Sequence, residues 1–162
     1  MSTQTTPMIE NTTHPHQGKL QDFLSYKLST LSNRLSLGTA RVYSRRFQLT
    51  MRDWRVLNVL EHYAPLSAAE VAEKILNDKG QVSRAVDKLV QRGFVHRRVD
   101  PDNRRKSVLE LTDAGHDIFA EINPIARQRE AELISELSPL EFKEFLALLE
   151  RLLAKVETLP DP

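Results

Sequence analysis

Between Asn77 and Gly115 the sequence pairs a short amphipathic helical pattern with two β-prone runs, and this order restricts the possible folds more than any other segment does. Apolar residues recur three and four positions apart up to Gly93, which is a typical residue for ending a helix. Two β-prone runs follow, and the Pro, Asp and Asn residues between them favour a turn. The segment therefore predicts a helix followed directly by a β-hairpin.

The helix expected from about Asp78 to Gly93 has two chemically different faces. The apolar residues predicted to face the core are Val82, Val86, Leu89 and Val90. The polar residues predicted to point away from it are Arg84, Lys88 and Gln91. A shorter helix with a Ser67–Glu70 capping box precedes it, and the pair matches a helix-turn-helix, whose second helix enters the major groove of DNA.

The first turns of this second helix would supply the contacts to DNA. An Arg fork can pair with two acceptors on guanine, and Ser or Gln can reach bases or phosphates from the start of a helix. The candidate contact residues on this helix are Gln81, Ser83, Arg84 and Lys88. Arg84 is the first choice for reading a base. The alternative is that Arg84 and Lys88 only solubilise an exposed face.

The hairpin expected from residues 94–99 and 107–111 would project its turn as a wing. Arg104 and Arg105 lie at the tip, where a guanidinium can enter the minor groove of DNA. Asp102 can orient Arg104 through a charge-assisted hydrogen bond. The alternative is an ordinary surface turn that contains an ion pair between residues two positions apart.

The charge distribution supports a polyanionic partner. Residues 79–106 contain nine Lys and Arg residues against three Asp and Glu residues, whereas the rest of the chain contains fourteen against nineteen. A basic segment in an otherwise acidic chain is expected where a protein contacts nucleic acid. A charged run is also often just a solvated face, so the sign of the charge does not decide between the two readings.

Apolar stripes near both ends of the chain indicate self-association. A long helix is expected from Leu20 to about Phe47, and its stripe consists of Leu24, Leu28, Leu31, Leu35, Gly38 and Val42. The last helix, capped at Ser138 and Pro139, has an apolar side formed by Phe142, Phe145, Leu146, Leu149, Leu152, Leu153 and Val156. These stripes are broad for a small monomer, so the first and last helices are expected to interlock across a two-fold axis. Bundling within one chain is the alternative.

A row of aromatic and polar residues suggests a ligand pocket. The helix that begins after the Thr50 cap is expected to bury Val56, Leu57, Val59, Leu60 and Tyr63. Away from that side, Trp54, Asn58 and His62 recur at steps of four. With Tyr43 and Arg46 from the end of the first long helix, this row would suit a small aromatic or carboxylate-bearing molecule. The alternative is that Trp54 belongs to the core, His62 to the surface and Arg46 to a salt bridge.

Several of these motifs together resemble the multiple-antibiotic-resistance-regulator (MarR) family of winged helix-turn-helix repressors. The matching residues are Leu49-Thr50 before Trp54, Val82-Ser83-Arg84, Leu89, Gly93, Arg98, Asp100 to Arg105, and Leu111 to Gly115. The resemblance covers residues 20–157, and the Asp-x-Arg tip of the wing is its most specific part. It implies that residues 78–93 form the recognition helix, that Arg104 is the minor-groove arginine, and that Asp102 orients it. It also implies that a small ligand releases the protein from its operator.

The chain is therefore expected to be mainly α-helical with a small β-wing, a winged helix-turn-helix DNA-binding lobe joined to a helical dimerisation region. The expected parts are a disordered N-terminal arm at 1–18, a dimerisation helix at 19–48, the DNA-binding lobe at 49–112 and C-terminal dimerisation helices at 113–158. The chain contains no cysteine, which excludes disulfides, thiolate metal sites and regulation by thiol oxidation. No apolar run is long enough to span a membrane and the start lacks a signal-peptide pattern, so a cytoplasmic protein is expected.

A regulator is the function that these patterns favour. Phosphate-binding glycine loops and the common hydrolase motifs are absent from the sequence, so neither an enzyme nor a bound cofactor or metal is expected. The partners expected are a double-stranded, pseudo-palindromic operator, a second copy of the chain and a small-molecule effector. The alternative function is an architectural protein that binds DNA without sequence preference or effector.

Overall fold

The structure, a computed structural model, describes residues 19–99 and 107–160, and helices dominate it. The elements in order are η1 (Leu20–Asp22), α1 (Leu24–Phe47), α2 (Met51–Tyr63), α3 (Ala68–Lys74), α4 (Lys79–Gln91), β1 (Val95–Val99), β2 (Ser107–Leu111), α5 (Asp113–Ile134) and α6 (Pro139–Val156). β1 and β2 pair as an antiparallel sheet. The expected class, mainly α-helical with a small β-hairpin, is confirmed.

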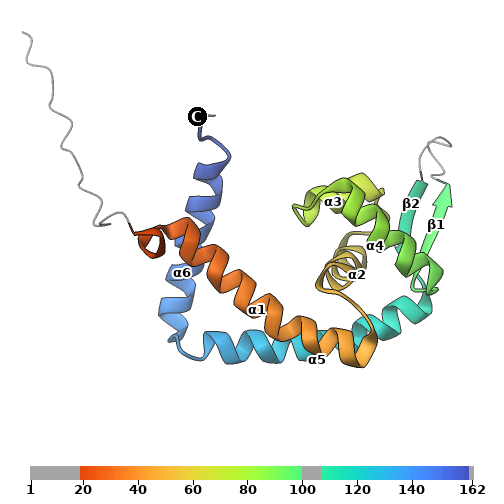
Figure 1. Ribbon diagram of the computed structural model, residues 1–162, viewed down its shortest axis with the longest axis horizontal. Coiled ribbons are helices and arrows are strands. Elements are labelled where there is room, and N and C mark those ends of the chain that lie inside the picture. Colours follow the sequence, from red (N-terminus) through yellow and green to blue (C-terminus); the bar gives the residue numbers. More distant parts are fainter. Residues whose placement is uncertain (1–18, 100–106, 161–162) are drawn as a thin grey trace, which may run out of the picture.

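The core lies in a lobe formed by α2, α3, α4 and the hairpin. Figure 1 shows this lobe on one side and α6 on the other, with α1 and α5 running between them. The fully buried side chains of the lobe include Leu57, Leu60, Val71, Val82, Val86, Leu89 and Leu109. The end of α1 contributes Tyr43 and Phe47 to the same core, and α5 contributes Phe119 and Ile122. The lobe is therefore joined to the long helices through apolar packing.

The predicted helix starts are confirmed by their caps. Thr50, Ser67 and Ser138 each accept a hydrogen bond from the backbone N–H three residues later, and the acidic residue at that position bonds back to the cap. Such a cap stabilises a helix by about 1 kcal/mol, because it satisfies N–H groups that the helix itself leaves without acceptors. Gly93, with φ of 75°, follows the end of α4 in a left-handed conformation that glycine adopts without strain.

The hairpin is anchored on its inner face. Val95 pairs with Leu111 and Val99 with Ser107, which sets the register of the two strands. Leu109 is buried on β2 and exchanges two backbone hydrogen bonds with Leu66, of 2.8 and 3.3 Å, in the loop before α3. The hairpin thus continues the core of the lobe. Residues 100–106, between the strands, lie outside the described part of the chain.

Two expectations about the helices are wrong. Tyr63 was expected in the core, but its side chain is 57% exposed. It is the last residue of α2, where the ammonium group of Lys74 lies over its ring, 4.1 Å from the ring centre, and the His62 ring lies beside it with 6.3 Å between ring centres. The first long helix begins at Leu24 rather than Leu20, because residues 20–22 form a short 3-10 turn and Phe23 is extended.

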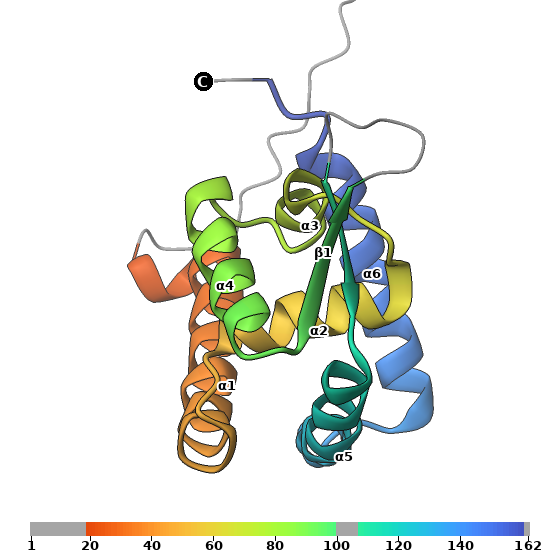
Figure 2. The ribbon, with the colours of Figure 1, turned by 90° about the vertical axis from the view of Figure 1, so that its right-hand side faces the viewer.

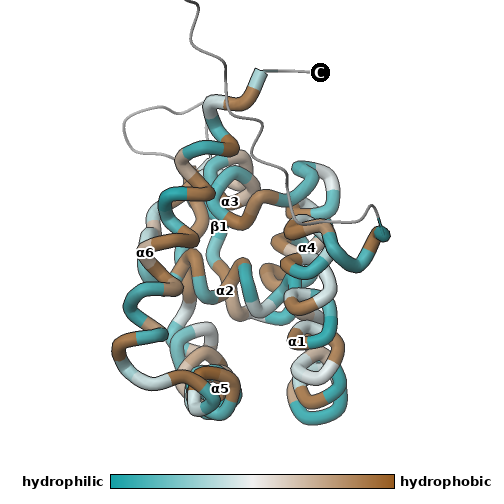
Figure 3. Tube along the Cα trace, turned by 90° about the vertical axis from the view of Figure 1, so that its left-hand side faces the viewer, coloured by the Kyte–Doolittle hydropathy of each residue, from teal (hydrophilic) through white to brown (hydrophobic). Residues whose placement is uncertain are grey.

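The apolar stripes of α1 and α6 are exposed in the single chain. No residue of α6 is buried, and in α1 only Tyr43 and Phe47 are. Figure 3 shows hydrophobic residues recurring along both helices. The residues concerned include Leu24, Leu28, Leu31 and Leu35 in α1, and Phe145, Leu146, Leu152 and Leu153 in α6. The alternative in which these stripes cover one another within one chain is therefore wrong.

Gly115 allows a close approach of α5 to the hairpin. A Cβ atom at this position would overlap the carbonyl group of Phe94, which accepts a hydrogen bond of 3.1 Å from the Thr112 N–H. We expect Gly115→Ala to destabilise the protein by about 2 kcal/mol, because backbone atoms must move apart to admit the methyl group. Chemical denaturation would measure this loss. Gly80→Ala, where only a side-chain oxygen of Asp78 lies near, is the control, and an equal loss in both variants would contradict the prediction.

Candidate nucleic-acid interface

Helix α4 has one buried and one exposed face. Its buried residues are Val82, Ala85, Val86 and Leu89, which pack against the core of the lobe. Lys79, Arg84 and Gln91 are exposed. Figure 2 shows α4 at the surface of the lobe, with the hairpin beside it. The face assignment expected from the sequence is thus confirmed for Val82, Val86 and Leu89 and for the exposed Arg84 and Gln91, whereas Val90 is half-buried.

Arg84 is one of two exposed cations on this helix that remain available for a partner. Within the described residues its side chain forms no ion pair or hydrogen bond, and the same is true of Lys79. Ser83, beside Arg84, is half-buried. The donors of a guanidinium without a protein partner can be used for a base edge or a phosphate. The arrangement therefore suits contact with an anionic surface.

Gln81 is engaged with a residue that the sequence did not single out. The side-chain oxygen of Gln81 accepts a very short hydrogen bond from the guanidinium of Arg52, in the first turn of α2. The side-chain oxygen is therefore occupied within the protein. Arg52 lies 29 residues before Gln81, and no local pattern in the sequence connects the two.

Lys88 was expected to point away from the protein, and this expectation is wrong. Its ammonium nitrogen lies 2.6 Å from Oδ2 of Asp53, a carboxylate that is only 2% exposed, and it also donates to the carbonyl oxygen of Gln48 at 3.2 Å. A buried carboxylate is costly without a partner, so it holds the nearest cation. The angular position of Lys88 on α4 could not reveal this, because Asp53 reaches it from another helix.

Most of the other described cations of the basic segment also have partners. Arg97 forms an ion pair with Asp87 at 2.7 Å, and Arg98 lies 3.5 Å from Glu110. Arg92 donates hydrogen bonds to backbone carbonyls at the end of α1. Fewer cations of this segment are therefore available for DNA than the sequence suggested, among the residues that the structure describes. Asp102, Arg104 and Arg105, the candidate residues of the wing tip, lie outside the described residues.

A cavity of about 310 Å³ lies where α1, α2 and α5 meet. Its lining residues are Leu35, Thr39, Tyr43, Met51, Trp54, Ala126, Arg129, Glu130 and Leu133. Tyr43 is fully buried, and its hydroxyl has no hydrogen-bond partner among the described residues. Burial raises the pKa of Tyr43, although the positive charge of Arg129 acts in the opposite direction. The hydroxyl is therefore protonated at neutral pH and can donate a hydrogen bond.

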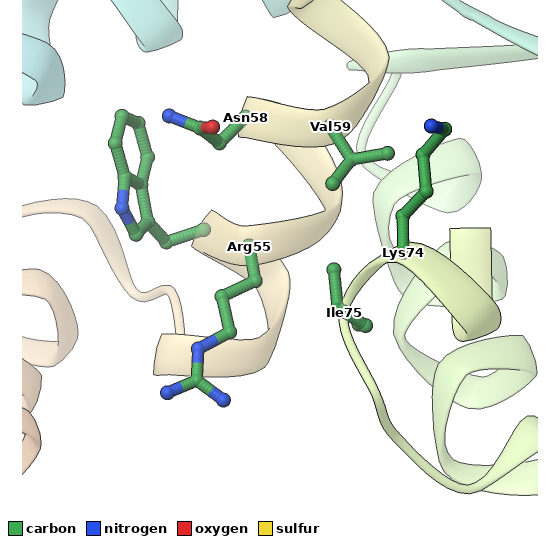
Figure 4. Close-up of a pocket in the computed structure, with 6 residues that line it drawn as sticks. Arg55, Asn58, Val59, Lys74 and Ile75 are labelled. Atoms are coloured by element: carbon green, nitrogen blue, oxygen red, sulfur yellow. The ribbon is translucent and has the colours of Figure 1, made fainter. Parts of the chain in front are cut away.

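The five residues predicted to line an effector pocket do not all meet in one place. Tyr43 and Trp54 line the cavity above, where the Trp54 ring stacks on Phe119 with 5.2 Å between ring centres. Trp54 and Asn58 also line a second cavity of about 380 Å³ between α2 and α3, drawn in Figure 4. In Figure 4 the labelled Arg55 and Lys74 side chains extend in opposite directions, so they do not converge on one ligand group.

Arg46 and His62 line neither of these cavities. The guanidinium of Arg46 lies over the ring of Phe47, 5.2 Å from its centre. His62 is exposed, and its Nδ1 lies 2.8 Å from the carbonyl oxygen of Asn58. Arg129 and Thr39 are lining residues that the sequence reasoning missed. No signal near Tyr43 pointed to Arg129, because it comes from α5 and meets α1 only after folding.

No helix in the described ranges is both long and apolar enough to cross a membrane.

Comparison with known proteins identifies similar transcriptional regulators. The profile of the MarR family matches residues 47–106. A Bacillus subtilis protein named as the uncharacterized HTH-type transcriptional regulator YkoM is 32% identical over 99 residues, which cover 61% of this chain and 64% of that protein. The chain spans about three fifths of the length of the first curated relatives that it matches. These relatives are named as transcriptional regulators and not as enzymes.

Solved structures show the same fold. The crystal structure of a MarR/EmrR family transcriptional regulator from Acinetobacter sp. ADP1 has a TM-score of 0.77 and 26% identity, and the match covers 83% of this chain and 95% of that one. The structure of the S. aureus MepR–DNA complex has a TM-score of 0.76 at 20% identity, covering 85% of this chain and 99% of that one. The second likeness concerns the fold alone.

Proposed function

Because this chain belongs to the MarR family of transcriptional regulators, we propose that it binds a specific, pseudo-palindromic DNA operator as a homodimer and acts as a cytoplasmic repressor. The observation that carries this proposal is Arg84. It lies on a helix whose opposite face is buried in the core, and its guanidinium has no partner within the described residues. A rigidly mounted helix with a free Arg fork suits the reading of a base pair in the major groove. The MepR–DNA complex supports the proposal through its similar fold.

The exposed stripes of α1 and α6 support the homodimer. Apolar side chains on both helices are exposed although the rest of the fold has a well-packed core. A second copy of the chain would bury them around a two-fold axis. Two recognition helices would then lie about 34 Å apart, so that each reads one half of a pseudo-palindromic site.

Competition between DNA duplexes tests the proposal against an architectural role. The duplex should be selected from a random-sequence pool by the full-length protein, and its affinity compared with that of a scrambled duplex of the same length. A regulator is expected to bind the selected duplex about a thousandfold more tightly or more. Similar affinities for both duplexes would favour the architectural protein instead.

We propose that Arg104 contacts the minor groove of DNA, and that Asp102 and Arg105 belong to the same contact. We expect Arg104→Ala to weaken binding to selected and scrambled duplexes alike. It should also lower the slope of log affinity against log salt concentration by about one unit, since one cation fewer displaces counterions from DNA. Fluorescence anisotropy at several salt concentrations measures both. An unchanged slope would mean that the wing tip does not contact DNA.

We further propose that a small aromatic molecule with a carboxylate or similar acceptor releases the protein from DNA. The cavity between α1, α2 and α5 supports this, because its wall contains the unpartnered Tyr43 hydroxyl and the cation of Arg129. The Trp54 side chain adds an aromatic surface. A ligand there would favour one arrangement of the lobe relative to the long helices, and release follows if that arrangement no longer matches the spacing of the two half-sites.

Tyr43→Phe tests the assignment of the ligand. We expect about fivefold weaker binding of an aromatic carboxylate such as benzoate, because one hydrogen bond is lost. Operator affinity without ligand should not change, since none of residues 19–99 and 107–160 forms a hydrogen bond with the hydroxyl. Calorimetric titration measures the ligand affinity, and a mobility-shift assay measures the operator affinity. Tyr26→Phe, on the exposed part of α1, is the control, and equal ligand affinity in all three proteins would exclude Tyr43 as a ligand contact.

A further inference from the structure

We propose that Lys88 and Arg92 are positioning residues that hold the recognition helix α4 against the last turn of α1, and that neither contacts DNA. This inference rests on the proposed function, because it concerns how α4 is aimed at an operator. Both residues belong to the basic segment that the sequence associates with DNA. Their contacts in the folded chain are instead with α1 and α2.

The contacts converge on the junction between α1 and α2. The Arg92 guanidinium donates to the carbonyl oxygens of Phe47 at 3.1 Å and of Gln48 at 3.2 Å. The Lys88 ammonium donates to the same Gln48 oxygen at 3.2 Å and to the buried Asp53 carboxylate at 2.6 Å. One backbone oxygen is therefore shared by two cations from α4.

The chemistry of this junction favours cations. The last carbonyls of a helix have no acceptor role inside it, and they form the negative end of the helix dipole. Gln48 is left-handed, with φ of 56° and ψ of 33°, and this conformation ends α1 immediately before the chain turns into α2. Arg92 also lies over the ring of Phe94, 4.7 Å from its centre, which restricts its side chain further. Both cations are thus used within the protein.

Contacts at both ends of α4 fix its position on the lobe. Near the first turn, Gln81 is bonded to Arg52 of α2. At the other end, Lys88 and Arg92 bind the α1–α2 junction. Arg84 lies between these two anchors, so the direction of its guanidinium depends on both. Release of one anchor is expected to let α4 tilt and to move Arg84 relative to the base pair that it reads.

The lead experiment uses Arg92→Met in the full-length protein. Lys88 still donates to the Gln48 carbonyl in this variant, and solvent can hydrate the Phe47 carbonyl, so the variant is expected to fold. We expect affinity for the selected duplex to fall about tenfold, with affinity for the scrambled duplex and the salt slope unchanged. The reason is that the orientation of α4 changes, while the charged contacts with DNA remain. Arg92→Lys keeps one donor and is expected to restore most of the loss.

The controls distinguish a change in the orientation of α4 from a loss of positive charge and from a loss of stability. Arg45→Met removes the same charge from an exposed site two residues before Phe47 and should leave both affinities unchanged. Equal losses on both duplexes with a lower salt slope in Arg92→Met would show a phosphate contact and overturn the inference. A loss that follows only the folded fraction, measured by thermal unfolding, would also overturn it.

A second variant and the wild-type protein distinguish failure of this inference from failure of the proposed function. Lys88→Met leaves the buried Asp53 without its cation, so we expect lower thermal stability together with reduced discrimination between the duplexes. Retention of full discrimination in a folded Lys88→Met protein would contradict its positioning role. If the wild type itself fails to discriminate, the proposed function falls and this inference falls with it. If the wild type discriminates and Arg92→Met does so equally, only the inference falls.

Discussion

Replacement of Phe145 and Leu152 in α6 by Asp is expected to leave the protein monomeric and to weaken operator binding by about a hundredfold or more. These side chains are exposed in the single chain, at 42% and 43%, so the core does not depend on them. They lie seven residues apart on one face of the helix. Charges placed there would have to be buried if a second chain covered α6, and an unpaired buried charge is strongly destabilising.

Light scattering with size-exclusion chromatography measures the mass, and anisotropy measures the affinity. The control is Lys143→Asp with Glu150→Asp, which introduces the same residue type at the same spacing on a polar part of α6. It should remain dimeric and bind the operator. A dimeric Phe145→Asp, Leu152→Asp protein with normal affinity would remove α6 from the proposed interface.

Replacement of Arg84 by Ala is expected to cost about 1 to 3 kcal/mol of operator binding and to remove discrimination at one base pair in each half-site. The guanidinium has no partner among the described residues, so thermal stability should not change. Loss of affinity would then be a loss of recognition. This separates Arg84 from Lys88, whose removal also affects the fold.

Binding to duplexes with single base-pair changes measures the discrimination. Gln91→Ala is the matched control, because Gln91 is exposed two turns later on the same side of α4. It should leave the pattern of preferred bases unchanged. If Arg84→Ala also leaves it unchanged, base reading would be reassigned to Ser83 and to the remaining donor of Gln81.

Local features of the fold could be predicted because their causes are local. A Ser or Thr followed three residues later by an acid determines a helix start through hydrogen bonds within a single turn, and Thr50, Ser67 and Ser138 all behave as predicted. The apolar spacing in α4 likewise identified three of its buried residues, Val82, Val86 and Leu89, since a regular helix turns every residue by a constant angle. The hairpin strands also lie where β-prone runs bracket the turn.

Side-chain partners from distant segments could not be predicted. The angular position of Lys88 on its helix predicted a side chain in solvent. Instead, Asp53 and Gln48 at the α1–α2 junction bind its ammonium group. Tyr63 fits the apolar spacing of α2, but it is the last residue of that helix and its side chain is exposed. In the expected effector row, Trp54 and Asn58 line one cavity with residues of α3, whereas the cavity that Trp54 shares with Tyr43 is completed by residues of α5.

The sequence by itself determined where the helices and strands begin, which side of α4 is apolar, and that both ends of the chain have apolar stripes, because propensity, capping and periodicity act over a few residues. Only the tertiary structure decided which cations remain available. Arg84 has no partner in the part of the chain that the structure describes, while Lys88 and Arg92 bind a buried carboxylate and the carbonyls at the end of α1. The reason is that an ion pair depends on distance in space, and these partners come together only when α4 packs against the end of α1.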